Sequence, residues 1–407
     1  MHIVQALLFL AVSFSVLGLT YGYTGWRIIA PYDLGPLATS ILWLTVAVFL
    51  VMPFAAILLR FSGHSVPGRT VLAWAAYLSL GFFTIVFTLV LARDTVYIVT
   101  RSVLFLARLI GNAGADGHAA AICGDFPQKA AIFLRFSNTA ILLLSLALIG
   151  YGVYGARRTP ETVTVDVPIQ GLHPGLADLR IVQITDIHAG PTIGRGYVSA
   201  IVDRVNALEP DIVAVTGDLA DGSPDILRDI IAPLGNIRSR YGLFFVTGNH
   251  EYYSGVTAWI AEAERLGMTV LTNDHRIIDH GGARLALCGI PDNEGGRFLE
   301  SHAPDPAGTL LGAGEADMSI LLAHQPVSVF EASKAGFDLQ ISGHTHGGQY
   351  MPFKWLVRLQ QPYISGLVRH GGTWLYVSRG TGYWGPPVRI GVPSEITLFN
   401  IIPSVKN

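Results

Sequence analysis

The sequence predicts an α-helical transmembrane domain of four spans, residues 1–156, followed by an α/β domain, residues 157–407. Three observations predict this division. Only 14 % of the 407 residues are charged, and the apolar excess falls almost wholly before about residue 156. Four windows in that part carry no charged side chain. Beyond Arg158, short apolar runs alternate with helix-like segments, which is the pattern of a sheet packed between helices.

The four uncharged windows are long enough to cross a membrane, because a helix needs roughly 20 apolar residues to span a bilayer core of about 30 Å. Met1-His2 offers no basic n-region and no A-x-A-like cleavage site follows, so we expect the first window to be a retained anchor. Tyr32, Trp26, Trp43 and Trp74 lie near window ends, as interfacial aromatic residues often do. The windows are Ile3–Tyr23, Leu37–Leu59, Val71–Ala92 and Phe136–Tyr154.

Basic residues favour a cytoplasmic C-terminal domain. Four spans place both chain ends on one side, together with Arg60 and Arg69 in a short loop and Arg157-Arg158 after the last span. Short loops weigh most in the positive-inside rule. Between the third and fourth windows, Val96–Ile110 is apolar except for two arginines, and either an interfacial helix or a loop helix packed on the bundle fits it.

Charge and cysteine content exclude two kinds of function. The net charge of −2 argues against a broad electrostatic grip on nucleic acid. Cys123 and Cys288 are the only cysteines, and this pair gives no basis for a disulfide framework or a thiolate metal site. Cys288 ends the apolar run Leu285–Cys288, which predicts an inert thiol in the core.

Five apolar runs of the C-terminal domain end in residues that can bind a metal. Ligands gather at the carboxyl ends of strands in α/β folds, so we expect these five ends to converge. A single D-x-H or Gly-Asp motif is more often a turn or a helix cap, and only the ordered set is informative. The runs and the residues that follow them are Leu179–Thr185 with Asp186 and His188, Ile212–Thr216 with Asp218 and Asp221, Leu243–Thr247 with Asn249 and His250, Ser319–Ala323 with His324, and Leu339–Ser342 with His344 and His346.

This ordered set resembles the calcineurin-like metallophosphoesterase superfamily, whose motifs run D-x-H, G-D-x-x-D, G-N-H-E, a lone His and G-H-x-H. All five occur here in order over roughly residues 179–350. The closer resemblance is to a bacterial branch with an N-terminal membrane segment, which shows G-H-T-H-G-G-Q, V-S-R-G and P-x-E-I, as here in Gly343–Gln349, Val377–Gly380 and Pro393–Ile396. The resemblance implies a two-sheet sandwich flanked by helices and an integral protein of the inner, cytoplasmic membrane.

The resemblance also implies a role for each residue. It assigns one metal ion to Asp186, His188 and His346, a second to Asn249, His324 and His344, and a bridging carboxylate to Asp218. A hydroxide shared by the two cations would attack phosphorus. His250 would stabilise charge or protonate the leaving group, and Asp221 would orient His250. Nitrogen and oxygen donors without thiolate favour Mn, Fe or Zn.

Other residues carry open alternatives. Glu251 fits the charge preference of a helix start and is left out of the site. Arg379 and Arg389 fit structural pairing better than a substrate phosphate, and Asn293 lies in a polar loop that could rim a pocket. Met351–Arg369 mixes bulky apolar with basic residues, which suits either packing on the core or contact with an interface or a lipid-linked phosphate.

The sequence therefore predicts a membrane-anchored, binuclear-metal phosphodiesterase or pyrophosphatase. Its expected partners are the lipid bilayer and a phosphorylated small-molecule or lipid-linked substrate. In related membrane-associated members of the superfamily, nucleotide-sugar lipids such as UDP-diacylglucosamine are cleaved at a pyrophosphate, which makes this a specific candidate. The alternative is a metal-binding membrane sensor or scaffold with vestigial activity. The complete set of ligand positions weighs against the alternative.

Overall fold

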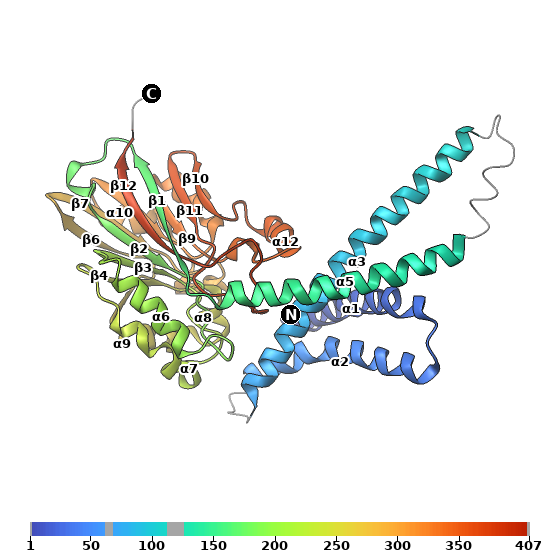
Figure 1. Ribbon diagram of the computed structural model, residues 1–407. Coiled ribbons are helices and arrows are strands. Elements are labelled where there is room, and N and C mark those ends of the chain that lie inside the picture. Colours follow the sequence, from blue (N-terminus) through green and yellow to red (C-terminus); the bar gives the residue numbers. More distant parts are fainter. Residues whose placement is uncertain (1, 62–67, 112–125, 405–407) are drawn as a thin grey trace. The chain divides into compact units, whose positions relative to one another are not determined.

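The computed structural model describes residues 2–61, 68–111 and 126–404 (Figure 1). The chain divides into two compact units. The helical unit comprises Met1–Ile57 and Ala75–Gly150, and the C-terminal unit comprises Leu58–Trp74 and Tyr151–Asn407.

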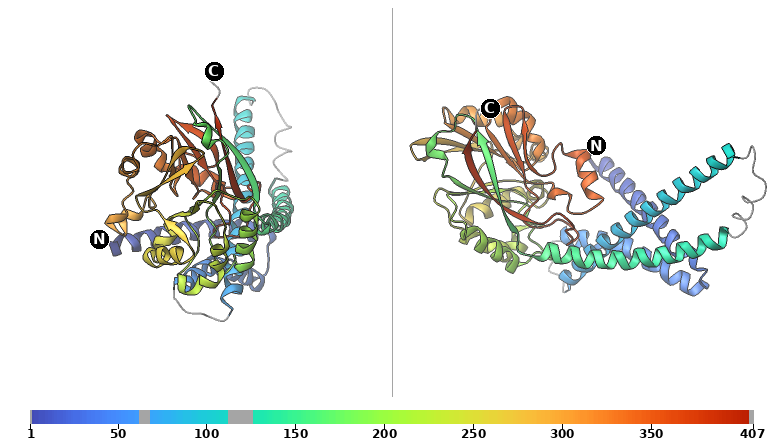
Figure 2. Two further views of the ribbon diagram at one scale, coloured as in Figure 1. Left: turned by 90° about the vertical axis from the view of Figure 1, so that its left-hand side faces the viewer. Right: turned by 45° about the horizontal axis from the view of Figure 1, so that its top comes forward.

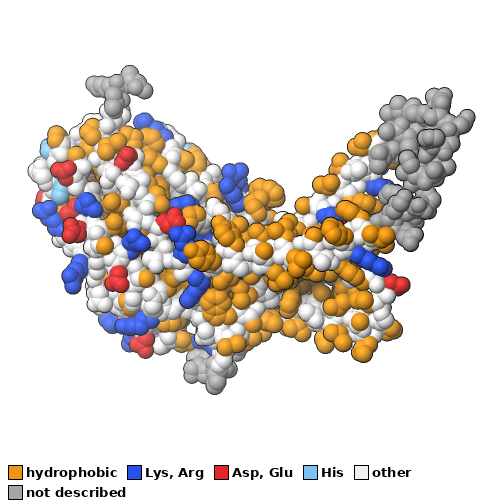
Figure 3. All heavy atoms as spheres, in the orientation of Figure 1, with side chains coloured by type: hydrophobic (Ala, Val, Ile, Leu, Met, Phe, Trp, Pro, Cys, Tyr) orange, Lys and Arg blue, Asp and Glu red, His pale blue; other side chains and the backbone are white. Residues whose placement is uncertain are grey.

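The helical unit is built from long apolar helices: α1 (His2–Ile29), α2 (Pro36–Phe61), α3 (Arg69–Gly111) and most of α5 (Phe126–Arg157), with the 3-10 turn η1 (Ala30–Tyr32) after α1. Among the described residues, three stretches are long and apolar enough to cross a membrane: Pro36–Ala56, Arg69–Val103 and Ala131–Arg157. Hydrophobic side chains crowd the visible surface of these helices in Figure 3. The first predicted span, Ile3–Tyr23, falls in α1, whose side chains before residue 11 lie outside the described part, so the count of four spans stays a prediction.

Helix α3 differs from the expectation in its length. The segment Val96–Ile110 is not a separate helix but the continuation of the third span. Arg93 and Asp94, which ended the uncharged window, lie inside this helix. The side chain of Asp94 is only 6 % exposed and accepts hydrogen bonds from Arg27 Nε at 2.5 Å, Arg93 Nε at 2.8 Å and the Tyr23 hydroxyl at 2.5 Å. Mutual pairing lets these charged groups remain buried among helices.

The C-terminal unit contains two six-stranded sheets, and this confirms the predicted α/β sandwich. The first has the order β1 (Glu161–Ile169), β12 (Glu395–Pro403), β2 (Arg180–Ile184), β3 (Ile212–Thr216), β4 (Gly242–Val246) and β5 (Met268–Val270). The second has the order β10 (Gly366–His370), β11 (Thr373–Val377), β9 (Leu339–Ser342), β8 (Met318–Leu322), β7 (Ala283–Gly289) and β6 (Asp274–His280).

The sheets face each other across one apolar core, with helices on their outer faces (Figures 1 and 2). Alternation along β3 shows how: Ile212 and Ala214 point into the core between the sheets, whereas Val213 and Val215 pack against the outer helices. The first sheet is covered by α6 (Arg195–Asn206), α7 (Pro224–Ile231) and α9 (Val256–Arg265), and the second by α10 (Pro306–Ala313) and α11 (Val329–Ala335). Cys288 is fully buried between the second sheet and the helices that cover it, as the sequence predicted. Burial raises the pKa of its thiol to about 12.

Short elements connect the strands and helices. Helix α8 (Asn249–Tyr253) begins with the predicted site residues Asn249 and His250, and α12 (Phe353–Gln360) follows the turn that contains His344 and His346. The 3-10 turns are η2 (Pro174–Leu176), η3 (Ala232–Asn236), η4 (Gly295–Arg297), η5 (Glu300–His302), η6 (Pro326–Ser328) and η7 (His346–Gly348).

The parallel strands of both sheets bring their carboxyl ends to one edge. Strands β2, β3 and β4 pair in parallel in the first sheet, and β7, β8 and β9 do so in the second. Gln183 of β2 ties the two sheets together near these ends, because its amide nitrogen donates to the Thr216 hydroxyl at 2.7 Å and to the Ser342 carbonyl at 3.0 Å. This edge carries the candidate site.

Candidate metal centre

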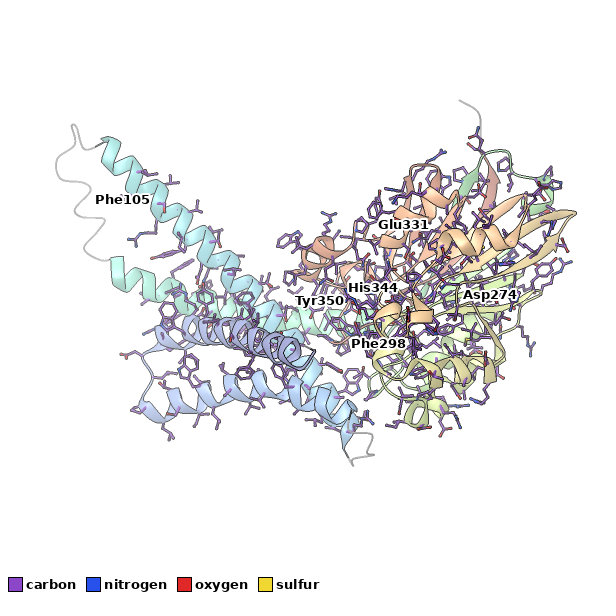
Figure 4. The ribbon with its side chains drawn as sticks, turned by 180° about the vertical axis from the view of Figure 1, so that it is seen from behind. Phe105, Asp274, Phe298, Glu331, His344 and Tyr350 are labelled. Atoms are coloured by element: carbon purple, nitrogen blue, oxygen red, sulfur yellow. The ribbon has the colours of Figure 1, made fainter. Side chains whose placement is uncertain are left out.

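The turns after β2, β3, β4, β8 and β9 bring their polar side chains together, although the chain between the first and the last is about 160 residues long. Among the described residues three groups form, and within each the potential ligand atoms all lie within 4.8 Å of one another; one of them is His188, Asp221 and His250, and the other two contain the predicted ligands. Of these two, the first is Asp186, His188 and His346, and the second is Asp218, His324 and His344. Asn249 joins the second group, since its Oδ1 lies 3.2 Å from Nε2 of His324. Figure 4 labels His344.

Asp218 stands between the two groups. One of its oxygens, Oδ2, lies 3.7 Å from Nε2 of His188 and 3.3 Å from Nε2 of His324. Each of these nitrogens also faces a second histidine: His188 and His346 approach to 3.0 Å, and His324 and His344 to 3.1 Å. A carboxylate oxygen shared by two nitrogen clusters is the arrangement that two closely spaced divalent cations require.

The hydrogen bonds behind the histidines fix which nitrogen faces the centre. His324 Nδ1 donates to the Thr216 carbonyl at 2.7 Å, and His188 Nδ1 lies 3.0 Å from Oδ1 of Asp221. In the neutral rings the Nε2 atoms therefore carry lone pairs. At the second group, Nε2 of His324 faces Oδ1 of Asn249 at 3.2 Å and Oδ2 of Asp218 at 3.3 Å, and either a proton on this nitrogen or a metal ion would satisfy the two oxygens.

The electrostatics of the centre agree with a cation site. Burial lowers the pKa of His344 to about 3, and burial together with His188 holds the pKa of His346 well below its usual range. Both rings are therefore neutral at pH 7, as metal ligands must be. Although burial opposes both shifts, Asp218 and His324 favour each other's charged form: the pKa of Asp218 lies well below its usual range and the pKa of His324 well above it. A metal ion at this position would therefore displace a proton from His324.

Local backbone strain aims these side chains. Positive φ angles, between 51° and 69°, occur at Asp186, His188, Asp218, His344 and His346. Residues with a Cβ seldom adopt this left-handed conformation, and its clustering in the turns of one site indicates that the surrounding fold holds it for a purpose. Two glycines allow the close approach of these turns: a Cβ on Gly248 would lie 2.2 Å from Oδ1 of Asp218, and one on Gly343 would lie 2.2 Å from Oδ2 of Asp186.

His250 lies beside the two groups and shares its carboxylate partner with one of them. Its Nδ1 is 2.6 Å from Oδ1 of Asp221, the same oxygen that binds His188. Two aromatic rings flank His250: Tyr253 at a centroid distance of 5.6 Å and Trp384 at 6.4 Å. Both rings are nearly half exposed, so they border the mouth of the site. No sequence motif includes Trp384, which approaches from a loop 134 residues further along the chain.

Glu251, which the sequence associates with the start of a helix, also connects two turns of the candidate site. Its side chain is fully buried and accepts hydrogen bonds from the backbone N–H groups of Gly248 at 2.7 Å, Leu219 at 2.8 Å and Asp218 at 3.0 Å. It therefore does more than favour a helix start, because it joins the turn of Asn249 to the turn of Asp218. Burial and the Asp218 carboxylate raise the pKa of Glu251 to about 7. Its place in the G-N-H-E motif was the available signal.

The remaining candidates have structural contacts. The Arg389 guanidinium is buried and donates to the carbonyls of Gly382, Arg379 and Val392, behind His346. Arg379 pairs with the buried Glu395 at 2.5 Å. Both arginines therefore pair structurally, as the sequence favoured. Asn293 is exposed and accepts a hydrogen bond from the Ser328 hydroxyl at 2.6 Å.

Sequence comparisons with known proteins cover the segment that contains these residues. The family profile described as "Calcineurin-like phosphoesterase" matches residues 179–348. A bovine protein named "Transmembrane protein with metallophosphoesterase domain" is 38 % identical over 285 residues, 67 % of this chain and 64 % of the relative. An uncharacterized metallophosphoesterase of Campylobacter jejuni is 40 % identical over 265 residues, 64 % of this chain and 68 % of the relative.

The chain thus spans somewhat less than two thirds of the bovine relative's length. Among solved structures, a dimetal phosphatase from Danio rerio is similar over 50 % of this chain and 88 % of its own, with 13 % identity and a TM-score of 0.34.

Proposed function

Because the chain belongs to the calcineurin-like phosphoesterase family, we propose that it is a membrane-anchored phosphodiesterase or pyrophosphatase with two divalent metal ions. The single observation that supports this most directly is the position of the Asp218 carboxylate, one oxygen of which faces Nε2 of both His188 and His324. A carboxylate oxygen that is shared by the ring nitrogens of two groups is what two closely spaced cations require.

The chain's own residues provide the ligands for both ions. Asp186, His188 and His346 would hold one, and Asn249, His324 and His344 the other, with Asp218 as the bridge. Nitrogen and oxygen donors suit Mn, Fe or Zn. Once bound, two such cations supply a nucleophilic oxygen at neutral pH and offset charge on the phosphoryl group.

His250 is the proposed proton donor to the leaving group. Asp221 accepts a hydrogen bond from Nδ1 of His250, which fixes the orientation of the ring. The other ring nitrogen, Nε2, is then the one available for acid catalysis. The same carboxylate stabilises the charged imidazole when it forms. Since Asp221 also orients His188, it couples the position of the proton donor to that of a metal ligand.

A lipid-linked phosphodiester or pyrophosphate is the proposed substrate class. Its support is the presence, in one chain, of membrane-type helices and of a site whose mouth is bordered by two half-exposed aromatic rings, Tyr253 and Trp384. Such rings can pack on a sugar or an apolar group of a substrate. A nucleotide-sugar lipid of the UDP-diacylglucosamine type, met at the cytoplasmic face of an inner membrane, is a concrete candidate.

The test uses the full-length protein, stripped with a chelator and reloaded with Mn²⁺. We expect hydrolysis of bis(4-nitrophenyl) phosphate to appear on reloading and to vanish on chelation. Parallel assays with a lipid-linked pyrophosphate and a soluble nucleotide pyrophosphate would then separate the two substrate classes. Binding of two metal equivalents without turnover, with Mn²⁺, Fe²⁺ or Zn²⁺, would instead favour the sensor or scaffold.

His250→Ala tests the proton donor. We expect it to keep both metals and to lose kcat by roughly 10²–10⁴, the usual contribution of general acid catalysis. His275→Ala, on the edge strand β6, is the matched control and should retain kcat. Loss of metal from His250→Ala, measured by elemental analysis, would show that His250 is a ligand rather than an acid.

A further inference from the structure

Helix α12 presents an unusual surface. None of its residues is buried, and its apolar side chains are strongly exposed: Trp355 by 60 %, Leu356 by 52 % and Leu359 by 83 %. The preceding Met351 and the ring of Trp384 are also exposed, by 41 % and 46 %. Single exposed apolar residues are common on soluble domains, but several together on one short helix mark an interaction surface. In Figures 1 and 2, α12 projects from the C-terminal unit beyond the strands of the second sheet.

The exposed side of α12 is ordered by residue type. At 100° per residue, Trp355, Leu356 and Leu359 form one apolar stripe, and Lys354 and Arg358, four residues apart, form a basic stripe along its border. Phe353 and Val357, on the opposite side, are the partly buried positions that attach the helix. Long basic side chains that border a Trp and Leu stripe can extend to lipid phosphates while the stripe enters the acyl boundary.

The surrounding chain is basic. From Leu339 to Ser394 the sequence contains no Asp or Glu, in a protein whose net charge is −2. Three of the five basic residues in this stretch are engaged: Arg389 and Arg379 in the contacts described above, and Arg369 over the ring of Trp374. Lys354 and Arg358 have no ion-pair partner among the described residues, and both are exposed.

Helix α12 is also coupled to the metal centre. It follows the motif that contains His344 and His346, and a Cβ on Gly348 would lie only 2.5 Å from Cα of Lys354, so the helix packs directly on the ligand turn. The next residue, Gln349, bonds the backbone of Trp384 in both directions: its Oε1 accepts from N at 2.6 Å and its Nε2 donates to O at 3.1 Å. Trp384 in turn borders His250. Figure 4 labels Tyr350, where the chain enters α12.

We infer that α12 and Met351 form an interfacial helix that lies in the headgroup layer of an anionic bilayer and holds the mouth of the metal centre at the lipid surface. The occupant of this surface is a lipid bilayer for two reasons. Membrane-type helices of the same chain keep such a surface within reach, and the two unpaired cations on α12 match the charge of anionic lipids. This docking does not depend on the identity of the substrate.

A depth measurement on the full chain tests the docking. The variant Leu359→Cys, in a Cys123→Ser background, is spin-labelled and reconstituted in vesicles of phosphatidylcholine and phosphatidylglycerol at 3:1. The matched control is Leu311→Cys on α10, which is equally exposed at 84 % but lies away from α12. We expect the label at 359 to collide with oxygen more than with a nickel chelate, and the label at 311 to show the reverse.

Three outcomes would overturn the inference. Equal, water-like accessibility at both positions would show that α12 stays in solution. Protection at 359 from both reagents would indicate a protein partner, and protection that vanishes on dilution with lipid would indicate a second copy of this chain. None of these measurements requires turnover, so a failure here leaves the proposed hydrolase activity untouched.

The charge contribution has its own test. Removing each cation, in Lys354→Gln and Arg358→Gln, should weaken the partition of α12 into the anionic surface about fivefold, the effect of roughly one basic residue near such a membrane. The difference between anionic and pure phosphatidylcholine vesicles should disappear in the double variant. Lys334→Gln, on the exposed face of α11, should leave that difference intact. An unchanged difference in the double variant would exclude lipid charge as the cause of docking.

Discussion

The helical unit and the C-terminal unit each bury a cluster of charged side chains, and the two clusters are built in opposite ways. In the helical unit, the carboxylate of Asp94 lies among donors from Arg27, Arg93 and Tyr23, while Asn138 donates to the carbonyls of Arg27 and Ile28 at the end of α1. Among the fully buried atoms of the two guanidiniums in the described residues, Nη2 of Arg93 lacks a hydrogen-bond partner. This cluster is close to complete by itself.

The metal centre uses imidazoles instead of guanidiniums. Nε2 of His324 faces oxygens of Asp218 and Asn249, and the Nε2 atoms of His188 and His346 face each other across 3.0 Å. The comparison shows that burial of charge alone does not identify a binding site. The type of donor does, because guanidiniums keep their protons and complete the Asp94 cluster, whereas imidazoles can give up a proton and bind a metal ion.

The largest expected effect comes from Asp218→Asn. An amide cannot neutralise two cations, so we expect the loss of at least one metal equivalent and a fall in kcat larger than the roughly 10–100-fold that follows loss of an outer-shell partner. Elemental analysis and phosphodiesterase assays measure the two effects. Asp225→Asn, in the first turn of α7, is the control. A variant that keeps both metals and its activity would mean that Asp218 is not the bridge.

Asp94→Asn makes the complementary change in the helical unit. It leaves two guanidiniums buried without their carboxylate, and breaking a buried pair typically costs about 3–5 kcal/mol. We expect the free energy of unfolding of the helices to fall by this amount. Circular dichroism during a titration with denaturing detergent measures it. Asp33→Asn, at an exposed position after η1, should have almost no effect. A loss below about 1 kcal/mol would show that water or lipid solvates these arginines and that the cluster is not self-contained.

The sequence predicted which side chains meet at the candidate metal centre because they follow separate strands, and parallel strands bring such turns to one edge of a sheet. The same local logic located the apolar helices. It failed at α3, where Arg93 and Asp94 ended the uncharged window. Their partner Arg27 lies 67 residues away, and only the folded bundle shows that the charges cancel and that the helix continues.

Long-range contacts explain the other omissions. Glu251 was assigned to a helix start because its neighbours in sequence suggested one, whereas two of its three hydrogen-bond donors lie 32 and 33 residues earlier. Trp384 contacts His250 from a loop that contains no recognisable motif. The left-handed backbone at Asp186 and His344 is imposed by the meeting of five turns, and no single segment specifies it.

Glu251→Gln should give the smallest of these effects. It refines the comparison of the two clusters, because the Glu251 carboxylate has its hydrogen-bond donors although it lies next to the candidate metal centre. Glutamine keeps one oxygen for the N–H groups of Gly248 and Asp218 but turns an amide nitrogen towards that of Leu219. One buried donor then lacks an acceptor, which costs about 1–3 kcal/mol. We expect metal content to be retained, thermal unfolding to shift by this amount and kcat to fall as the Asp218 turn loosens. Glu264→Gln, exposed on α9, should change neither quantity. Lost stability with unchanged kcat would make Glu251 a purely structural residue, whereas lost metal would place it closer to the ions than its contacts indicate.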